Sequence, residues 1–322
     1  MGKITKIILA LMSIPAVMFG AGVTGADILK EDIGVKALAL GSAYTAVGND
    51  VESINYNPAG IAFVDVRDVE AYYVKNYAGA LDVELYNISY AQPIETTFLD
   101  GSFAIEGTYR GMPTISNPDA TDPGVQYNDI LIKAVYAVNA AKLNYITWSE
   151  SKYLSLGVAA GIVLEQIGTW SGSSVVFDLG SQFVFYDTGF KFGAAIQNIG
   201  TPIKFISESS PLPTTLRLGA SYSGRIDKSN VGLLAFDYIQ DLYDYARFGF
   251  GAEDSILNVF HLRAGYNTSI DTRSASYLSA GAGMTVKLLE TTVMVDYTFR
   301  LQFWNGFTGP QQSHLIGLGA RF

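Results

Sequence analysis

The sequence predicts an all-β protein, a transmembrane antiparallel β-barrel of about 14 strands with a short N-terminal hatch inside its lumen. Three observations predict this fold. Apolar and polar residues alternate along many segments, the chain opens on a stretch typical of exported proteins, and it closes on an alternating segment with an aromatic last residue.

The alternation is clearest in residues 291–301, TTVMVDYTFRL. Val293, Val295 and Tyr297 share one face and Asp296 lies on the other, which is the two-residue period of a β-strand. Three further segments repeat the pattern: 154–165, 216–222 and 278–287. These strands exceed the ~5–6 residues usual in soluble proteins and suit the ~9–11 residues of a tilted membrane strand.

Segments of this kind predict fourteen strands, an even number as bacterial barrels prefer. Their expected ranges are 66–76, 83–92, 101–110, 129–139, 153–165, 174–185, 190–198, 213–223, 230–239, 246–254, 257–267, 275–287, 290–301 and 312–322. Short turns are expected at 187–189 and 287–290, and longer Pro-rich loops at 112–128 and 201–212. We expect a single barrel domain.

The composition excludes several classes of protein. The chain is 49% hydrophobic and 13% aromatic, yet after residue 26 no unbroken apolar run approaches the ~20 residues of a membrane helix. The chain has no cysteine, which excludes a disulfide scaffold and a thiolate metal site. A formal net charge of −9 without a basic patch argues against a nucleic-acid partner.

The first residues are typical of a secretory signal. Lys3 and Lys6 precede an apolar run from Ile7 to Phe19, which is too short to span a bilayer and fits a cleaved signal peptide. We expect residues 1–26 to be removed, with cleavage after Ala21 and an uncleaved anchor as less favoured alternatives. Loss of the two lysines leaves the mature chain at about −11.

The last residues alternate back from an aromatic terminus. Leu318, Ala320 and Phe322 share one face of the expected final strand. This pattern resembles the C-terminal strand signature by which outer-membrane barrels are recognised for insertion. The resemblance implies that Phe322 is an assembly signal for the barrel assembly machinery, and that the protein lies in the lipid of the cell outer membrane.

Residues 27–63 remain outside the strands and are expected to fill the lumen. Eight-stranded barrels are filled by their own side chains, whereas 16–18 strands leave an aqueous channel. A barrel of 14 strands therefore needs a plug or a lining. The expected organisation is a signal peptide at 1–26, a hatch at 27–63 and a barrel at 64–322.

Within the expected hatch, the stretch NYNPAG, residues 55–60, carries two strong breakers of regular structure. Residues 50–55 suit a short helical turn that Pro58 ends, and Pro58 restricts Asn57 to an extended conformation. Asn57 and Gly60 then permit a compact turn that leads into the first strand. The alternative is a solvent-exposed linker.

Residues 34–60, GVKALALGSAYTAVGNDVESINYNPAG, resemble the N-terminal signature of the PorV/PorQ family of outer-membrane proteins, a branch of the FadL-type transporters of hydrophobic compounds. Residues 192–200 and 211–222 are also similar to stretches of that family. In FadL-type proteins an N-terminal hatch occupies the lumen and carries an Asn-Pro-Ala motif. The resemblance implies that Asn57, Pro58, Ala59 and Gly60 form the hatch motif here.

Catalytic chemistry is poorly supported by the sequence, and no enzyme activity, cofactor or metal is expected. A Ser–His pair on one strand face requires an i, i+2 spacing, whereas Ser313 and His314 are adjacent and His261 has no Ser two residues away. A partner for His261 on another strand stays open. Asp187-Thr188-Gly189 occurs once, whereas aspartic-protease chemistry needs two carboxylates, so a turn is the favoured interpretation.

Charged residues at inward strand positions are the remaining site candidates. They are Glu165, Arg217, Asp237, Arg247, Glu253, Arg263, Asp296, Arg300 and Arg321. The favoured interpretation of most of them is a ladder of ion pairs and hydrogen bonds that holds the plug. The alternative is that one or two basic groups receive the carboxylate of an amphipathic ligand.

The sequence thus favours an outer-membrane barrel that binds or passes hydrophobic or amphipathic small molecules, of the long-chain fatty acid type. This function rests on the family resemblance, which is an analogy. The alternative is a non-transporting scaffold or shuttle for protein secretion, as in PorV-type proteins. A barrel enzyme is a third, disfavoured hypothesis.

Overall fold

The computed structural model describes residues 24–78, 81–95, 101–115, 125–140, 152–205, 208–271, 275–303 and 310–322. Residues 1–23, which carry most of the expected signal peptide, lie outside the described residues. Among the residues it describes, no helix is long and apolar enough to cross a membrane.

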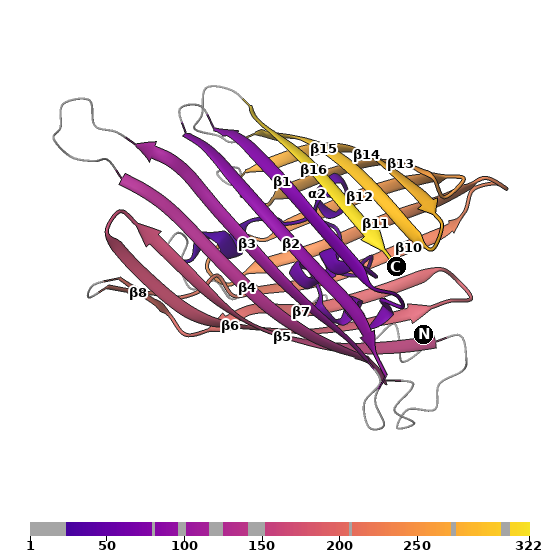
Figure 1. The fold of residues 1–322 in the computed structure, drawn as a ribbon, viewed down its shortest axis with the longest axis horizontal. Helices are drawn as coiled ribbons and strands as arrows, with labels where there is room; N and C mark the ends of the chain where they lie inside the picture. Colours follow the sequence, from indigo (N-terminus) through magenta and orange to yellow (C-terminus); the bar gives the residue numbers. More distant parts are fainter. Residues whose placement is uncertain are drawn as a thin grey trace.

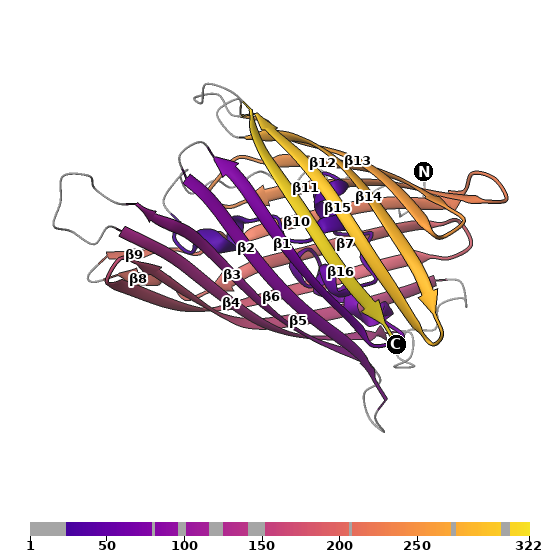
Figure 2. The same cartoon turned by 45° about the horizontal axis from the view of Figure 1, so that its top comes forward.

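Fourteen of the sixteen described strands form a closed antiparallel barrel (Figures 1 and 2). The strands are β1 (Asp68–Ala78), β2 (Leu81–Ile94), β3 (Gly101–Ile115), β4 (Val125–Asn139), β5 (Lys152–Ile167), β6 (Trp170–Phe185), β7 (Phe190–Gly200), β8 (Ile203–Phe205), β9 (Glu208–Ser210), β10 (Thr215–Arg225), β11 (Asn230–Asp241), β12 (Arg247–Ile256), β13 (Phe260–Ser269), β14 (Ser276–Leu288), β15 (Thr291–Phe303) and β16 (Gln311–Arg321). The fold class and the number of wall strands predicted from the sequence are confirmed.

The wall closes where the first strand meets the last. Asp68 of β1 pairs with Arg321 of β16, and the register continues to Tyr77 opposite Gln312. Every other neighbour in the wall follows chain order, except that β7 pairs with β10 because β8 and β9 form a separate two-stranded hairpin. Residues 201–212 were predicted to be a loop. That prediction is wrong for β8 and β9, whose three residues each are too few to show a period.

The strands are longer than the alternation predicted at several ends. β3 runs to Ile115 and β4 begins at Val125, so the loop predicted at 112–128 is shorter in the structure. Both predicted short turns are confirmed. Gly189, with a φ of 76°, ends the turn at 187–189, and the turn between β14 and β15 needs only residues 289 and 290.

The two ends of the barrel differ. We call the end where β1 starts and β16 finishes the C-terminal rim. Its described connections are short: 186–189, 226–229, 257–259 and 289–290. The opposite rim carries the two-residue connection 168–169 and the longer connections 201–214, 242–246 and 270–275. Outer-membrane barrels have short periplasmic turns and longer extracellular loops.

The outer face of the wall is apolar. On β6, positions 173, 175, 177 and 179 are exposed while 174, 176 and 178 are buried. Ile88, Leu234 and Leu318 each expose about 60% of their surface. An apolar band of this extent suits hydrocarbon rather than water.

The N-terminal residues lie inside the barrel, where Figure 1 shows them in indigo behind the wall. We call residues 24–64 the luminal segment. It contains the short helices η1 (Asp27–Lys30), α2 (Val35–Ala39), η2 (Val51–Asn55) and η3 (Pro58–Phe63). Its apolar side chains form the core with inward residues of the wall; Ile54, Ile61 and Val64, for example, pack with Ala91 and Val135. The core therefore lies between the segment and the wall.

Candidate functional site: the filled lumen

Asn57 ties the luminal segment to itself and to the wall. Its backbone is extended, with φ −157° and ψ 105°, and its side-chain oxygen accepts a hydrogen bond from Ala59 N at 3.1 Å. Its Nδ2 donates to Thr45 O at 2.8 Å and to Ser181 O on β6 at 2.9 Å. One buried amide therefore fixes a turn, a second stretch of the segment and a strand of the wall.

Pro58 begins a helix rather than ending one. The helical turn expected at 50–55 is present as η2, but it ends at Asn55, and Pro58 is the first residue of η3. The prediction that Pro58 ends the earlier turn is therefore wrong. Proline suits this first helical position because it has no N–H to leave unpaired and its φ is already near the helical value. The linker alternative is also wrong, since Pro58 and Ala59 are buried.

Three glycines of the wall make room for this motif. A Cβ at Gly157 of β5 would lie 2.4 Å from Ala59 N, one at Gly180 of β6 would lie 2.1 Å from Asn57 Oδ1, and one at Gly193 of β7 would lie 2.2 Å from Thr45 O. These separations are shorter than any side chain tolerates. The glycines on the polar strand faces thus allow the backbone of the luminal segment to lie directly against the wall.

The same arrangement continues around the barrel. A Cβ at Gly251 of β12 would lie 2.6 Å from Leu40 O, and one at Gly265 of β13 would lie 2.1 Å from Gly41 N. Side chains of the wall also donate to carbonyl groups of the segment: Asn267 to Gly41 O at 3.0 Å and Thr298 to Val35 O at 2.8 Å. We call these wall glycines, Gly157, Gly180, Gly193, Gly219, Gly249, Gly251, Gly265 and Gly281, the glycine girdle.

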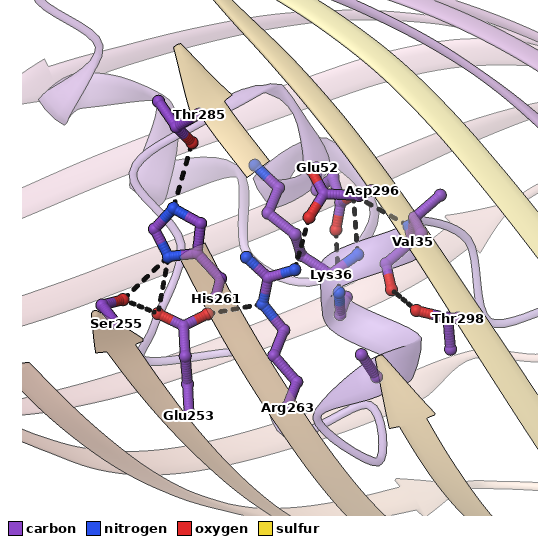
Figure 3. A network of polar contacts seen from close by, with 12 residues as sticks. Val35, Lys36, Glu52, Glu253, Ser255, His261, Arg263, Thr285, Asp296 and Thr298 are labelled. Carbon is purple, nitrogen blue, oxygen red and sulfur yellow. Dashed lines mark hydrogen bonds and ion pairs between the residues drawn. The ribbon is translucent and has the colours of Figure 1, made fainter. Parts of the chain in front are cut away.

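Glu52 caps helix α2 inside the lumen (Figure 3). Its carboxylate accepts backbone N–H groups from Val35 at 2.8 Å, Lys36 at 3.0 Å and Ala37 at 2.8 Å. A carboxylate is stabilised at this position because the first N–H groups of a helix have no partner within it. Burial nevertheless raises the pKa of Glu52 to about 7, against the opposing effects of Lys36 and the donated N–H groups.

Lys36 joins the luminal segment to the closing seam of the wall. Its ammonium contacts Asp50 at 2.7 Å and Glu70 of β1 at 2.9 Å. Asp50 also accepts from Tyr44 OH at 2.8 Å and lies 3.8 Å from Arg321 of β16. Burial opposes the charge on Lys36, but Asp50 and Glu70 outweigh it and hold the pKa of the ammonium well above its ordinary value.

Five of the nine predicted charged residues contact the luminal segment. Asp237 accepts from Tyr44 N at 3.1 Å and from Thr45 N at 3.0 Å. The other four pairs are Glu165 with Ala26 N at 2.9 Å, Arg217 with Asp32 at 3.5 Å, Arg247 with Asp32 at 3.4 Å and Arg321 with Asp50 at 3.8 Å.

The other four predicted residues connect strands of the wall. Arg263 of β13 pairs with Glu253 of β12 and with Asp296 of β15. Arg300 donates to Asn76 Oδ1 at 3.0 Å and to Ser313 Oγ at 3.1 Å. The sequence reasoning missed a further buried pair, Lys133 with Asp178 at 2.9 Å. The sequence signal for this pair was Lys133 itself, a single lysine within the apolar run of β4.

His261 has the cross-strand partners that the sequence left open (Figure 3). Its Nδ1 lies 2.8 Å from Ser255 Oγ on β12 and its Nε2 lies 3.0 Å from Thr285 Oγ1 on β14. Ser255 Oγ also donates to Glu253 Oε1 at 2.8 Å. This chain of contacts joins three neighbouring strands. Ser313 and His314 face opposite sides of the wall, as predicted: Ser313 is buried and His314 meets Tyr297 OH at 2.7 Å on the outer side.

Cavities lie on both sides of the luminal segment. The larger one, of about 640 Å³, faces the opposite rim, and its apolar lining includes Ile28, Leu29, Ile33 and Leu131. Its charged lining includes Lys133, Arg217 and Arg247. A second space of about 370 Å³ shares Arg247 and Gln302 with it. Toward the C-terminal rim lies a third cavity of about 300 Å³, lined by Lys36, Lys191 and His261 among others.

Known structures share this architecture. The toluene transporter TbuX of Ralstonia pickettii superimposes with a TM-score of 0.58 at 13% identity, over 91% of this chain and 99% of that one. The CymD monoaromatic hydrocarbon channel gives 0.58 at 9% identity over 90% and 97%. The toluene transporter TodX of Pseudomonas putida gives 0.55 at 12% identity over 90% and 97%.

At such identities the likeness shows a common barrel fold. No protein-family model and no curated protein sequence matches the chain. The resemblance to the PorV/PorQ family therefore stays a prediction.

Proposed function

We propose that this protein is an outer-membrane channel for hydrophobic or amphipathic small molecules, with the luminal segment as its gate. The observation that carries the proposal is the cavity of about 640 Å³, which is open toward one rim and ends on the first residues of the luminal segment. The cavity is large enough for a small-molecule ligand, and its lining joins an apolar patch around Leu29 to many polar and charged groups, which suits an amphipathic molecule. The fold shared with proteins named as hydrocarbon transporters supports the same function.

The cavity lining carries charges of both signs, with Glu31, Asp241, Asp244 and Asp271 beside the basic residues, and Arg217 and Arg247 are the pair that would receive the carboxylate of a ligand. Asp32 of the luminal segment accepts from both Arg217 and Arg247, at 3.5 and 3.4 Å. Burial opposes the ionisation of Asp32, but Arg247 and Arg217 hold the pKa of its carboxyl below the ordinary value. A fatty acid carboxylate would compete with Asp32 for the two arginines while its chain contacts Leu29, the partly exposed apolar residue of the lining.

The location follows from the same proposal. The C-terminal rim, with its short turns, would face the periplasm, and residues 1–26 would be removed on export. Phe322 ends β16 with half of its surface exposed, and its backbone pairs with Arg67. Deleting Phe322 should lower the amount of assembled barrel without lowering synthesis, as judged from membrane fractions. Equal amounts of assembled protein would contradict its role as an assembly signal.

The test of function uses purified protein in liposomes. Uptake of radiolabelled palmitate and toluene is compared with empty liposomes and with an Arg217→Gln/Arg247→Gln variant. We expect uptake of both compounds by the wild type, and a selective loss of palmitate uptake of about tenfold in the variant, since two charge-assisted contacts are removed. If the variant takes up both compounds as well as the wild type does, carboxylate recognition by the two arginines is contradicted.

Uptake of neither compound above empty liposomes would contradict the channel itself. The alternative, a scaffold or shuttle for secreted proteins, then becomes the function to test. It predicts that an exported protein copurifies with the barrel from native membranes. The channel proposal predicts that lipid or another hydrophobic compound copurifies instead.

A further inference from the structure

The outer face of the wall has an indentation near the C-terminal rim. A groove of about 540 Å³ crosses strands β10 to β13, and its lining is mostly apolar. Small outward residues line it, but the side chain of Tyr222 lies over Gly224 and that of Ile226 over Gly232, so Ala252 and Ala264 form its open part. Leu234 and Leu262, which expose 62% and 54% of their surfaces, flank these small residues.

The strand register shows why the groove is continuous. Gly224 lies opposite Gly232, which lies opposite Asp254, in the row nearer the C-terminal rim. In the next row Leu234 lies opposite Ala252, which lies opposite Ala264. The groove also touches Leu233 and Arg263, which belong to the inner face of the wall. The small side chains of Ala252 and Ala264 thus bring the floor of the groove close to the backbone of β12 and β13.

The groove is polar at one end only. Asp254 lies on the outer face at the rim, where Asn230 Nδ2 holds its carboxylate at 3.1 and 3.0 Å. Arg225, the last residue of β10, belongs to the inward row opposite Val231, but it is exposed at the rim and also lines the groove. Toward the middle of the wall the lining is alanine and leucine. A polar end at the membrane interface and an apolar end in the hydrocarbon match the polarity of a phospholipid in the leaflet on that side.

We propose that this groove binds one phospholipid of the zwitterionic ethanolamine class. An acyl chain lies in the furrow made by Ala252 and Ala264, the phosphate contacts Arg225 at the rim, and the ammonium contacts Asp254. Filling the furrow removes apolar surface from contact with mobile lipid and gives the chain a fixed partner. The inference concerns the outer wall and does not depend on what passes through the lumen.

The acyl-chain contact is tested with delipidated protein in neutral detergent, titrated with palmitoyl-oleoyl phosphatidylethanolamine and read by native mass spectrometry. Ala252→Leu with Ala264→Leu fills the furrow. We expect binding to weaken by about tenfold or more, because several methylene groups lose their burial. The control is Ala71→Leu, an outward alanine on β1 opposite Ile88 and Leu318, which should bind like the wild type.

The headgroup contacts are tested in the same titration. Arg225→Gln should weaken binding by about fivefold, the effect of one basic group near the membrane surface. The matched control is Arg67→Gln, an exposed arginine at the same rim but beside β1 and outside the groove. Asp254→Asn should weaken binding of phosphatidylethanolamine but not of phosphatidylglycerol, which lacks the ammonium.

Each outcome decides the proposal. Equal lipid binding by the furrow-filled variant and the wild type would overturn it, provided that both remain heat-modifiable barrels. A dimer that disappears in that variant would also overturn it, because a second copy would then be the occupant. An equal loss of lipid binding in the Arg225→Gln and Arg67→Gln variants would show only a general electrostatic attraction of lipid to the rim. That result would contradict phosphate recognition in the groove.

Discussion

The two parts of the luminal segment are held in different ways. Residues 34–64 lie against the glycine girdle, with short buried hydrogen bonds such as Asn57 to Ser181 at 2.9 Å. Residues 24–33 border the large cavity, and Asp32 reaches its arginines only at 3.4–3.5 Å. Asp27 and Lys30 are exposed there. We therefore expect residues 34–64 to be the more tightly held part and residues 24–33 to move more readily, although Ala26 N is bonded to Glu165 at 2.9 Å.

The largest effect is expected from filling the glycine girdle, which tests whether the girdle holds residues 34–64 in place. In Gly180→Val, the new side chain occupies the space of Asn57 Oδ1, 2.1 Å from the Cβ position. We expect release of residues 34–64, at a cost of about 1–3 kcal/mol or more, seen as new protease cleavage sites and faster small-solute leak from liposomes. Gly107→Val is the control, because its Cβ would meet only Ile88 at 4.0 Å. Similar protection in both variants would contradict the fixed plug.

A second variant changes the Asn57-Pro58 motif itself and leaves the wall glycines that it packs against unchanged. Asn57→Ala with Pro58→Ala deletes the side-chain bonds to Thr45 O and Ser181 O and leaves buried groups unpaired, at about 1–3 kcal/mol for each group. The barrel should stay folded and heat-modifiable, because its strands pair with each other. Small-solute leak should increase. Unchanged leak and unchanged protease sensitivity would show that the motif does not hold the plug.

A third variant acts on residues 24–33 alone and tests whether they move independently of residues 34–64. Asp32→Asn removes the charge that pairs with Arg217 and Arg247 and should weaken attachment by about 1 kcal/mol. Hydrogen exchange should rise in residues 24–33 and stay unchanged in residues 34–64. An equal rise in both parts would show that the segment moves as one unit.

The smallest expected effect is one of pH. The pKa of Glu52 is raised to about 7, so the capped helix is most stable with this group protonated, below the ordinary value of 4.5, and that contribution is lost as the pH rises through 7. The pKa values of Asp32 and Asp50 are lowered, so these groups stay ionised throughout this window. The protection factors of the α2 amides, which correct for the rise of intrinsic exchange with pH, should therefore fall between pH 5 and pH 8, and Glu52→Gln should flatten the dependence. An unchanged pH profile in Glu52→Gln would contradict this assignment.

Much of the wall was predictable because a strand's period is local. Two-residue alternation gave each of the fourteen wall strands and the inward direction of residues such as Arg217 and Asp237. The β8–β9 hairpin was missed because three residues carry no period. The Ser255–His261 contact was missed because it depends on which residues of β12 and β13 face each other, and alternation does not set that register.

The luminal segment was predictable only in outline. The Asn-Pro-Ala resemblance and the unassigned length predicted a plug, and the structure places residues 24–64 in the lumen. The partners of Asn57 lie 12 and 124 residues away in the chain. Contacts at that separation follow from the closed wall and leave no local pattern. The glycine-rich polar faces were visible in the sequence, but their purpose was not.

The glycine girdle also bears on how the strands find their correct partners. A strand that slips by one residue turns its apolar face inward, so alternation rejects it, but a slip of two residues keeps every side chain on its proper face. In β6 such a slip would place Asp178 or Gln182 where Gly180 meets Asn57. The luminal segment would then clash with a side chain. The segment thus makes two-residue misalignments unfavourable and contributes to the accuracy of barrel assembly.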